Sequence, residues 1–305
     1  MTTPSPSPAP SRCGFVAIIG APNAGKSTIV NALVGQKVAI VSPKAQTTRT
    51  RLMGVAMDGE TQIILIDTPG IFAPTRRLDR AMVAAAWNSL DQAEAILVMI
   101  DAAAKLGERA ERVLQGIEGR PEKKFLVLNK VDLTKKDKLL TIATQLNERV
   151  AFDETFFISA STGDGVPELK AHLAKLMPEG HWHFPEDEVS DAPERMLAAE
   201  ITREQLYRQL HEELPYQSTV ETEKFTTRPD GSAEIHQQIL VARDNQRAII
   251  LGHKGERIKE IGSKARAELA ELLGRKVHLF LHVKVKANWD EDRSVYRDMG
   301  LDWVD

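Results

Sequence analysis

The sequence predicts two consecutive domains: an α/β domain with a mostly parallel sheet and helices on both faces, then a smaller α+β domain. From Phe15 to about Met177, five short apolar runs alternate with longer helical patterns, which is the rhythm of a parallel sheet. After a stretch rich in proline and acids, the expected order becomes helix, strand, strand, helix, helix, strand. With 305 residues, 42% of them hydrophobic and 27% charged, the chain suffices for two ordinary globular domains.

The expected strands of the first domain are FVAII at 15–19, TQIILID at 61–67, AILVMID at 95–101, KFLVLN at 124–129 and ETFFISA at 154–160. Each is followed by turn residues and then by a helix-like stretch. Because ligands on parallel sheets bind at the carboxyl ends of the strands, the residues that follow each run are the candidates for a site.

The second domain begins after HWHFPEDEVSDAPER, which has the composition of a linker. Leu197, Ile201, Leu210 and Leu214 share the helical spacing of one face. A hairpin about Pro229–Gly231, helices at 246–251 and 256–273, and an alternating strand at 276–285 follow. The expected ranges are a disordered tail at 1–11, the first domain at 12–180, a linker at 181–195, the second domain at 196–290 and a C-terminal extension at 291–305.

Charge and cysteine content limit the function classes. The formal net charge of -3 gives no global reason to expect nucleic acid, so any basic surface must be local. The single Cys13 excludes an internal disulfide, and we interpret it as a small buried side chain. His181 and His183 lack neighbours at ligand spacing, so a metal site there is not expected.

The sequence shows no recognisable signal peptide or membrane span. The opening MTTPSPSPAPS lacks the charged and apolar regions of a signal peptide. No apolar run approaches the roughly 18 residues of a membrane span. We therefore expect a cytoplasmic protein.

The stretch GAPNAGKS at 20–27 fits G-x-x-x-x-G-K-[ST] between a strand and a helix. Gly20 and Gly25 let backbone N–H groups close on a β-phosphate, and the helix N-terminus adds its dipole. Lys26 supplies charge to the β- and γ-phosphates, and the Ser27 hydroxyl ligates Mg²⁺. The expected nucleotide contacts here are Gly20, Ala21, Pro22, Asn23, Ala24, Gly25, Lys26, Ser27 and Thr28.

DTPG at 67–70 ends the second apolar run. Asp67 stands where a carboxylate beside the Mg²⁺ belongs, and the Gly70 N–H can meet a γ-phosphate. Alone the pattern is weak, but in register with the P-loop it predicts a phosphate site. The contacts expected here are Asp67, Thr68, Pro69, Gly70 and Ile71.

NKVD at 129–132 closes the fourth run and determines the base. The Asp132 carboxylate can accept two hydrogen bonds from guanine, a pair that adenine does not offer. Asn129 would brace the loops, the Lys130 stem would lie over the base, and the Ala160 N–H would bond guanine O6. The expected base contacts are Asn129, Lys130, Val131, Asp132, Ser159 and Ala160. An ATP-dependent enzyme is the alternative, and it requires that Asp132→Asn leave base preference unchanged.

The polar stretch SPKAQTTRTR at 42–51 lies between these motifs. A threonine here can complete the Mg²⁺ shell only when a γ-phosphate is present, which makes a switch. Thr48 is the first choice and Thr47 the second; a plain surface loop is the alternative. Ser27, Thr48 and Asp67 are then the expected Mg²⁺ residues.

Together, GAPNAGKS, QTTR, DTPG, NKVD and the Ser159-Ala160 pair resemble the translation-factor class of P-loop GTPases over roughly residues 14–177. The resemblance implies GTP hydrolysis to GDP with Mg²⁺. Ile71 stands where the Ras-like pattern has a glutamine that orients water, so another group must assist. By this resemblance Asn23 helps to hold a K⁺ ion that supplies the charge of an arginine finger. The expected catalytic residues are Asn23, Lys26, Thr48 and Gly70.

A second glycine turn, GHKG at 252–255, sits between two helical patterns of the second domain. This setting resembles a type II KH domain, whose GXXG loop holds single-stranded RNA. From 243 to 286 the chain has 11 Lys or Arg against 5 Asp or Glu, which suits phosphate contacts. The expected RNA contacts are Gly252, His253, Lys254, Gly255, Arg257 and Lys259.

Joined in one chain, the two domains resemble the Era family of bacterial assembly GTPases. This resemblance implies binding of small-subunit (16S) rRNA near its 3′ end and action on the 30S ribosomal subunit precursor. It further implies a monomer that is cytoplasmic and also loosely peripheral on the inner membrane. The alternative is a membrane-associated or protein-interaction GTPase whose C-terminal domain is a dimer interface. RNA affinity separates the two hypotheses.

Overall fold

The computed structural model describes residues 11–44 and 46–304. The disordered tail expected at 1–11 therefore lies outside the described residues except for Ser11. The chain divides into two compact units. The first comprises residues 1–38, 52–72 and 86–191, and the second comprises 39–51, 73–85 and 192–305.

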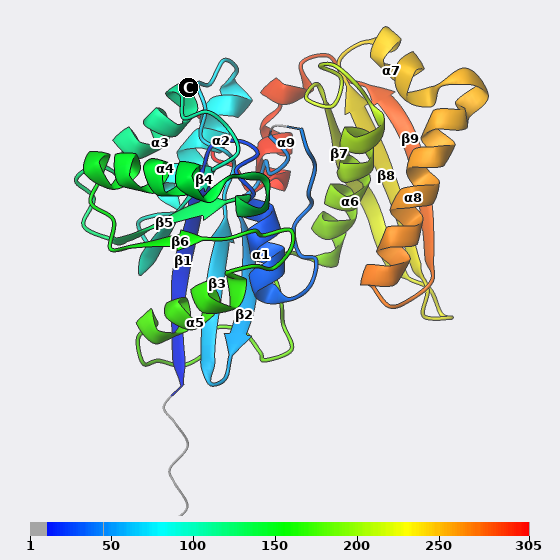
Figure 1. Ribbon diagram of the computed structural model, residues 1–305. Coiled ribbons are helices and arrows are strands. Elements are labelled where there is room, and N and C mark those ends of the chain that lie inside the picture. The colour runs from blue at the N-terminus through cyan, green and yellow to red at the C-terminus, as the bar shows by residue number, and fades with distance from the viewer. Residues whose placement is uncertain (1–10, 45, 305) are drawn as a thin grey trace, which may run out of the picture. The chain divides into compact units, whose positions relative to one another are not determined.

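The first unit contains a six-stranded sheet in the order β2-β3-β1-β4-β5-β6 (Figure 1). All neighbouring strands run parallel except β2, which pairs antiparallel with β3. The strands are β1 (Arg12–Gly20), β2 (Leu52–Asp58), β3 (Thr61–Asp67), β4 (Ala95–Asp101), β5 (Lys123–Asn129) and β6 (Glu154–Phe157). Every residue of β3 is buried, as expected of a strand covered on both faces.

Helices cover both faces of this sheet, which confirms the predicted fold class. Helix α1 (Lys26–Val34) contacts α5 (Val166–Leu176), and both helices contact β2 and β3. On the opposite face, β1, β4 and β5 pack against α3 (Glu108–Ile117), α4 (Lys136–Arg149) and the end of α2 (Arg77–Asn88) in one core cluster. The P-loop and the loops after β3, β4 and β5 follow the carboxyl ends of their strands.

The second unit has the predicted helix-strand-strand-helix-helix-strand order of a KH domain. The elements are α6 (Glu194–Gln209), β7 (Ser218–Thr227), β8 (Ala233–Val241), α7 (Asp244–Leu251), α8 (Glu256–Leu272) and β9 (Val277–Val285). Strand β8 is central, antiparallel to β7 and parallel to β9. Ile235, Ile239 and Val241 face the helices, as their alternation predicts. A 3-10 turn at Trp289–Glu291 and α9 (Arg293–Asp298) follow β9.

Some boundaries differ from the sequence expectation. Helix α6 ends at Gln209, so Leu214 lies beyond it although its spacing matched the helical face; it still packs into the core. Strand β6 ends at Phe157, before the predicted Ser159-Ala160. Strand β2 was not expected, because Gly54 interrupts its apolar pattern. A Cβ on Gly54 would lie 2.9 Å from Val30 Cγ1 of α1, so the helix requires glycine there.

Residues 181–191, expected to be linker, pack on the first unit. The Val55 N–H donates to Val189 O at 2.9 Å, and the Met53 N–H donates to the Asp191 carboxylate at 2.9 Å. Gln62 Nε2 donates to Phe184 O at 2.9 Å. Within the described ranges, none of the helices combines the length and the apolar character that crossing a bilayer requires.

Candidate nucleotide site and nucleic-acid interface

Three glycines shape the P-loop and its surroundings. Gly25, directly before α1, has φ 98°, and a Cβ there would lie 2.1 Å from Asn129 Nδ2. A Cβ on Gly20 would lie 2.5 Å from Met99 O, and one on Gly70 would lie 2.9 Å from Pro22. Larger side chains would therefore push apart the loops that the sequence predicts to hold phosphates.

Lys26 begins α1 and is only 6% exposed. Its Nζ donates to Gly20 O at 3.3 Å and to Ala21 O at 3.2 Å, so the ammonium lies inside the P-loop. Burial lowers the pKa of Lys26 to about 8, although the charge of Asp67 acts in the opposite direction. A bound polyphosphate would favour the protonated form and raise this pKa again.

Ser27 and Asp67 lie together as predicted for a Mg²⁺ site. Ser27 Oγ donates to Asp67 Oδ2 at 2.6 Å. Asp67 is fully buried, as is Thr68, whose hydroxyl donates to Ile18 O at 2.7 Å. Hydroxyl and carboxylate oxygens are the ligands that Mg²⁺ prefers, so these residues fit the ion.

Asn129 joins three loops, as the sequence predicts. Its Nδ2 donates to Ala24 O of the P-loop at 2.8 Å, and its Oδ1 accepts from the Ala160 N–H at 3.0 Å. The N–H expected to bond guanine O6 therefore already has a partner, and a guanine would have to share it. Asn129 is 2% exposed, so these bonds are shielded from water.

Lys130 and Asp132 occupy the turn after β5. Lys130 has φ 66°, and its Nζ contacts Asp101 Oδ2 at 2.6 Å. This ion pair fixes the Lys130 stem that is expected to lie over the base. Asp132 is exposed in a 3-10 turn and Val131 is half-buried, so the Asp132 carboxylate is accessible to a ligand.

Asn23 and Ile71 differ in their access to the site. Asn23 is exposed in the middle of the P-loop, with φ 67°. The Ile71 side chain is fully buried in the core, and its N–H donates to Gly20 O at 3.0 Å. Only the main chain of Ile71 adjoins the P-loop, which agrees with the inference that its side chain does not orient water.

Thr47 and Thr48 belong to the second unit, whereas Ser27 and Asp67 belong to the first. The Thr47 hydroxyl donates to Lys44 O at 2.8 Å, and Thr48 is half-buried. The role of Thr48 as a Mg²⁺ ligand therefore stays a prediction. Two further predicted nucleotide contacts are Thr28, which is half-buried, and Pro69, which is buried.

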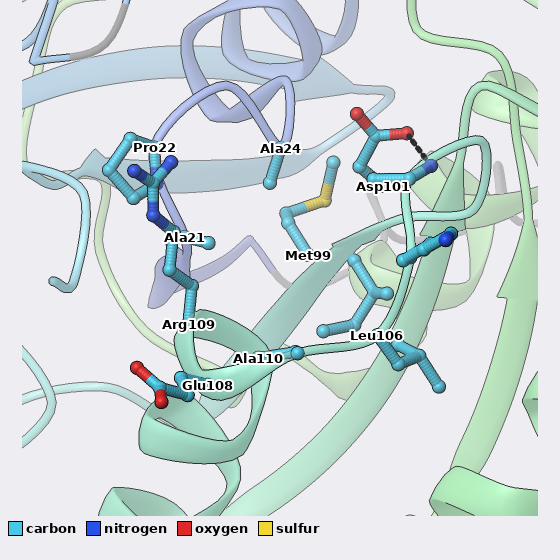
Figure 2. Close-up of a pocket in the computed structure, with 13 residues that line it drawn as sticks. Ala21, Pro22, Ala24, Met99, Asp101, Leu106, Glu108, Arg109 and Ala110 are labelled. Atoms are coloured by element: carbon cyan, nitrogen blue, oxygen red, sulfur yellow. Dashed lines mark hydrogen bonds between the residues drawn. The ribbon is translucent and has the colours of Figure 1, made fainter.

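A cavity of about 440 Å³ adjoins the P-loop. Figure 2 shows it between Ala21, Pro22 and Ala24 on one side and Met99, Leu106 and the start of α3 on the other. Asp101 lies at its edge and accepts a hydrogen bond from the Ala104 N–H at 3.2 Å. Neither Lys26 nor Asp132 lines the cavity, so it is a neighbour of the expected nucleotide site.

The GHKG turn has the backbone that its glycines predict. Gly252 has φ 70° and ψ -178°, a conformation essentially confined to glycine. His253 and Lys254 are exposed at the tip of the turn, and Gly255, with φ 81°, directly precedes α8.

The flanks of this turn are less uniformly basic. Arg257 Nη1 donates to Ile249 O at 3.0 Å, and Lys259 is exposed on the next turn of α8. Glu256 lies in the first turn of α8, where its charge weakens the attraction of the helix N-terminus for phosphate. Lys254, Arg257 and Lys259 must outweigh that carboxylate if RNA binds here.

Three residues of interest were not singled out from the sequence. Asp101 ends the run AILVMID, where a strand-end carboxylate could have been noted. Ile249 is 47% exposed on α7 beside GHKG, and apolar periodicity does not distinguish such a side chain from core. Arg49 belongs to the QTTR motif, which predicts no role for its side chain, yet it is 1% exposed in the second unit.

Comparison with known proteins agrees with both domains. A family model described as 50S ribosome-binding GTPase matches residues 15–130, and a KH domain model matches residues 213–290. GTPase Era of Erythrobacter litoralis is 61% identical over 298 residues, covering 96% of this chain and 98% of the relative. GTPase Era of Afipia carboxidovorans is 57% identical over 294 residues, covering 96% of each chain.

Two solved structures resemble the chain over nearly its whole length. One is Era in complex with MgGDPNP and nucleotides 1506–1542 of 16S ribosomal RNA; the other is a variant of Aquifex aeolicus Era bound to GDP and AlF4⁻. Each has a TM-score of 0.90 and 40% identity, covering 95% of this chain and 99% of the other. The chain therefore belongs to the Era family of GTPases, with a P-loop GTPase domain followed by a KH domain.

Proposed function

We propose that this GTPase is a GTP-controlled switch that binds single-stranded 16S rRNA near its 3′ end and acts in assembly of the 30S ribosomal subunit. The observation that carries the proposal is the exposed GHKG turn between α7 and α8 of a KH domain. A relative with 40% identity, matched over 95% of this chain, binds nucleotides 1506–1542 of that RNA. That segment is called the 3′-end RNA below.

The GTPase domain holds the nucleotide through main-chain amides and a few polar side chains. In this proposal the P-loop amides and Lys26 bind the β- and γ-phosphates, and the Gly70 N–H meets the γ-phosphate. Asp132 selects guanine, and Asn129 keeps the surrounding loops in place through its two hydrogen bonds. Ser27, Asp67 and Thr48 would hold Mg²⁺, which supplies charge stabilisation to the phosphates when bound.

Hydrolysis of GTP lacks a side chain that orients water at position 71, since Ile71 is buried. We propose that K⁺ supplies additional positive charge and that Asn23 helps to hold it. The exposed position of Asn23 in the P-loop supports this role. Unaided turnover is then slow, and a partner that completes the site would accelerate it.

RNA would approach the GHKG turn because its glycines leave the main chain uncovered. A Cβ on Gly255 would meet nothing within 4 Å, so the space above it is open to a sugar-phosphate chain. Lys254 and the basic residues of α8 would neutralise phosphates, and the exposed Ile249 offers an apolar surface to a base.

The test is binding of the 3′-end RNA to a double variant, His253→Asp with Lys254→Asp. We expect RNA affinity to fall at least about 100-fold, because like charge opposes phosphate at the point of contact, while GTP hydrolysis persists. The control carries the same charge change on α4, Lys136→Asp with Thr141→Asp, where both side chains are exposed. If the double variant bound RNA as tightly as the control, the KH turn would not be the RNA site.

A further inference from the structure

Arg49 lies in the segment that is expected to act as a switch, and all its hydrogen bonds described below are made within the second unit. Its Nη1 donates to Ser218 O at 2.8 Å. Its Nη2 donates to Tyr207 Oη at 3.0 Å, Tyr216 O at 3.1 Å and Pro215 O at 3.2 Å. The guanidinium thus connects residues 39–51 with α6 and with the segment that leads into β7.

The surroundings of Arg49 are unusual for a charged group. Its guanidinium carbon lies 5.8 Å from the Tyr207 ring centre and 5.9 Å from that of Trp289. The four hydrogen-bond acceptors are neutral, and burial lowers the pKa of Arg49. Such a site is favourable only while all its hydrogen bonds are made, since removal of the guanidinium would leave several carbonyls without a donor. We call Tyr207, Pro215–Ser218 and Trp289 the Arg49 pocket.

The rest of the segment is attached to the same unit. Ile40 packs in a core cluster with residues of α6, β8 and α8. Lys44 Nζ donates to Tyr207 O and Leu210 O, and Thr47 O accepts from Arg203 Nη2. Arg49 is therefore one part of an extended attachment, and it is the part adjacent in sequence to Thr48.

The Arg49 pocket also adjoins residues 73–85 of the same unit. Arg76 Nη1 donates to Tyr216 O at 3.4 Å, the same carbonyl that accepts from Arg49. Trp289 Nε1 donates to Gln217 O at 3.1 Å, so the pocket is also braced by the 3-10 turn that follows β9. A change at Arg49 would therefore alter the hydrogen bonds of the residues that precede β7 of the KH sheet.

We propose that Arg49 is the positioning residue that transmits the nucleotide state from Thr48 to the Arg49 pocket of the RNA-binding domain. Thr48 engages Mg²⁺ only with GTP, and the peptide chain connects it directly to Arg49. In this proposal, engagement of Thr48 changes the free energy of Arg49 in its pocket, and by reciprocity the pocket changes the affinity for GTP. This inference rests on the proposed role of Thr48 and does not require that RNA binds.

The first test measures amide hydrogen exchange of the full-length protein with GDP and with a nonhydrolysable GTP analogue, both with Mg²⁺. In the wild type we expect exchange of the amides at 216–218 to differ at least about fivefold between the two nucleotides, the lower end of ordinary allosteric coupling. In Arg49→Met the difference should vanish while P-loop amides still respond. A purely structural defect would raise exchange in both nucleotide states and would leave their ratio unchanged.

Two further variants keep the test decisive. If Arg49→Met is poorly folded, Tyr207→Phe takes its place in the test. This change removes one acceptor of Arg49 and preserves packing, so it should reduce the difference in exchange between the two nucleotides. The matched control is Arg195→Met, because Arg195 Nη2 also donates to carbonyls of this unit, at Thr222 and Glu223, which are not part of the Arg49 pocket. It should respond like the wild type.

An unchanged nucleotide response in both Arg49→Met and Tyr207→Phe would overturn the proposal, as would a wild type without any response. A second measurement separates it from the proposed function. Where the wild type binds the 3′-end RNA, the effect of RNA on affinity for the GTP analogue should be lost in Arg49→Met. Failure of the wild type to bind RNA would contradict the RNA function alone, since the exchange experiment contains no RNA.

Discussion

At the scale of single residues, Lys26 shows how a site can be built against the preference of its own side chain. The buried Lys26 ammonium donates to two neutral carbonyl oxygens at 3.2 and 3.3 Å, which do not neutralise its charge. Burial therefore lowers its pKa to about 8. The triphosphate would supply the missing charge. The cost of burying Lys26 in the nucleotide-free protein is then recovered on binding, which favours a liganded state.

We predict that binding of a GTP analogue takes up a proton between about pH 8 and pH 10.5. In this window Lys26 is mostly neutral in the free protein and protonated in the complex, so affinity falls as pH rises through the free pKa of about 8. Calorimetry in two buffers with different ionisation enthalpies measures the uptake. Lys26→Arg is the control, because arginine does not titrate there; equal uptake in that variant would assign the proton elsewhere.

The stability of the nucleotide-free protein should follow the same titration. A lysine with a folded pKa of about 8 and an ordinary pKa of 10.5 binds more protons unfolded than folded between these values. The contribution of Lys26 therefore opposes folding below pH 8 and disappears as pH rises through 10.5. Comparing urea unfolding of the wild type and Lys26→Met at pH 7.5 and pH 9.5 tests this. The stabilisation gained by the variant should be smaller at the higher pH.

Asn23 gives a prediction about K⁺. Because its φ is 67°, alanine would add backbone strain, and Asn23→Gly removes the side chain without it. We expect GTP hydrolysis by the wild type to be at least about tenfold faster in KCl than in NaCl, a modest share of what an arginine finger contributes. Asn23→Gly should hydrolyse GTP at the same rate in both salts. Equal rates for the wild type in the two salts would remove K⁺ from the mechanism.

The sequence can predict the residues of a nucleotide site because their spacing is local. GAPNAGKS and DTPG each act through consecutive residues beside a strand end, so the pattern and the chemistry coincide. Hydrogen bonds between distant residues were only partly accessible. The bracing role of Asn129 was expected, but its use of the Ala160 N–H was not, because that N–H was assigned to guanine O6.

At the scale of elements, the KH turn joins two glycines with different tasks. A Cβ on Gly252 would lie 2.7 Å from Arg257 Cβ, whereas one on Gly255 would meet nothing within 4 Å. Gly252 thus allows α7 and α8 to meet, and Gly255 leaves open space where RNA is expected. The motif as a pattern treats the two positions alike, and only their surroundings separate them.

We predict that Gly252→Ala and Gly255→Asn separate folding from RNA binding. Gly252→Ala should lower the free energy of unfolding by about 1–3 kcal/mol, the usual cost of a residue held in a disfavoured conformation. Gly255→Asn should change it by less than about 1 kcal/mol, because asparagine accepts the left-handed region. It should nevertheless weaken binding of the 3′-end RNA. Urea unfolding and RNA titration of both variants check this, and tight RNA binding by Gly255→Asn would contradict the close approach.

Elements with regular periodicity were predicted well, and those shaped by a neighbour were not. The strands β3, β4 and β5 are continuous apolar runs, and α8 keeps its 3-or-4 spacing. Strand β2 contains Gly54 because α1 approaches it closely, so its sequence reflects the helix rather than the strand. Leu214 matches the helical spacing of α6 only by chance, because the helix has already ended at Gln209.

At the scale of the whole molecule, the order of residues along the chain does not predict which residues belong to each compact unit. Residues 39–51 and 73–85 are inserted in the GTPase sequence, yet both belong to the unit that contains the KH domain. Arg77, in the second of these segments, pairs with Glu291 at 3.0 Å and lies 4.4 Å from the Trp303 ring centre. These contacts join residues more than two hundred positions apart, which composition and periodicity do not reveal.

The last prediction concerns the isolated fragment 192–305, which contains the whole KH sheet but lacks both inserted segments. It loses Ile40 from its core, Arg49 from the pocket beside Trp289, and Arg77 from Trp303. Losing the buried Ile40 side chain alone should cost about 1.5–3 kcal/mol, and several unpaired carbonyls add to that. We expect the fragment to unfold at a clearly lower temperature than the same region of the full chain, with a weakened near-UV signal from Trp289 and Trp303. Adding a peptide of residues 39–51 should restore part of the stability, while a scrambled peptide should not. A fragment as stable as the full chain would show that the inserted segments only rest on a domain that is complete without them.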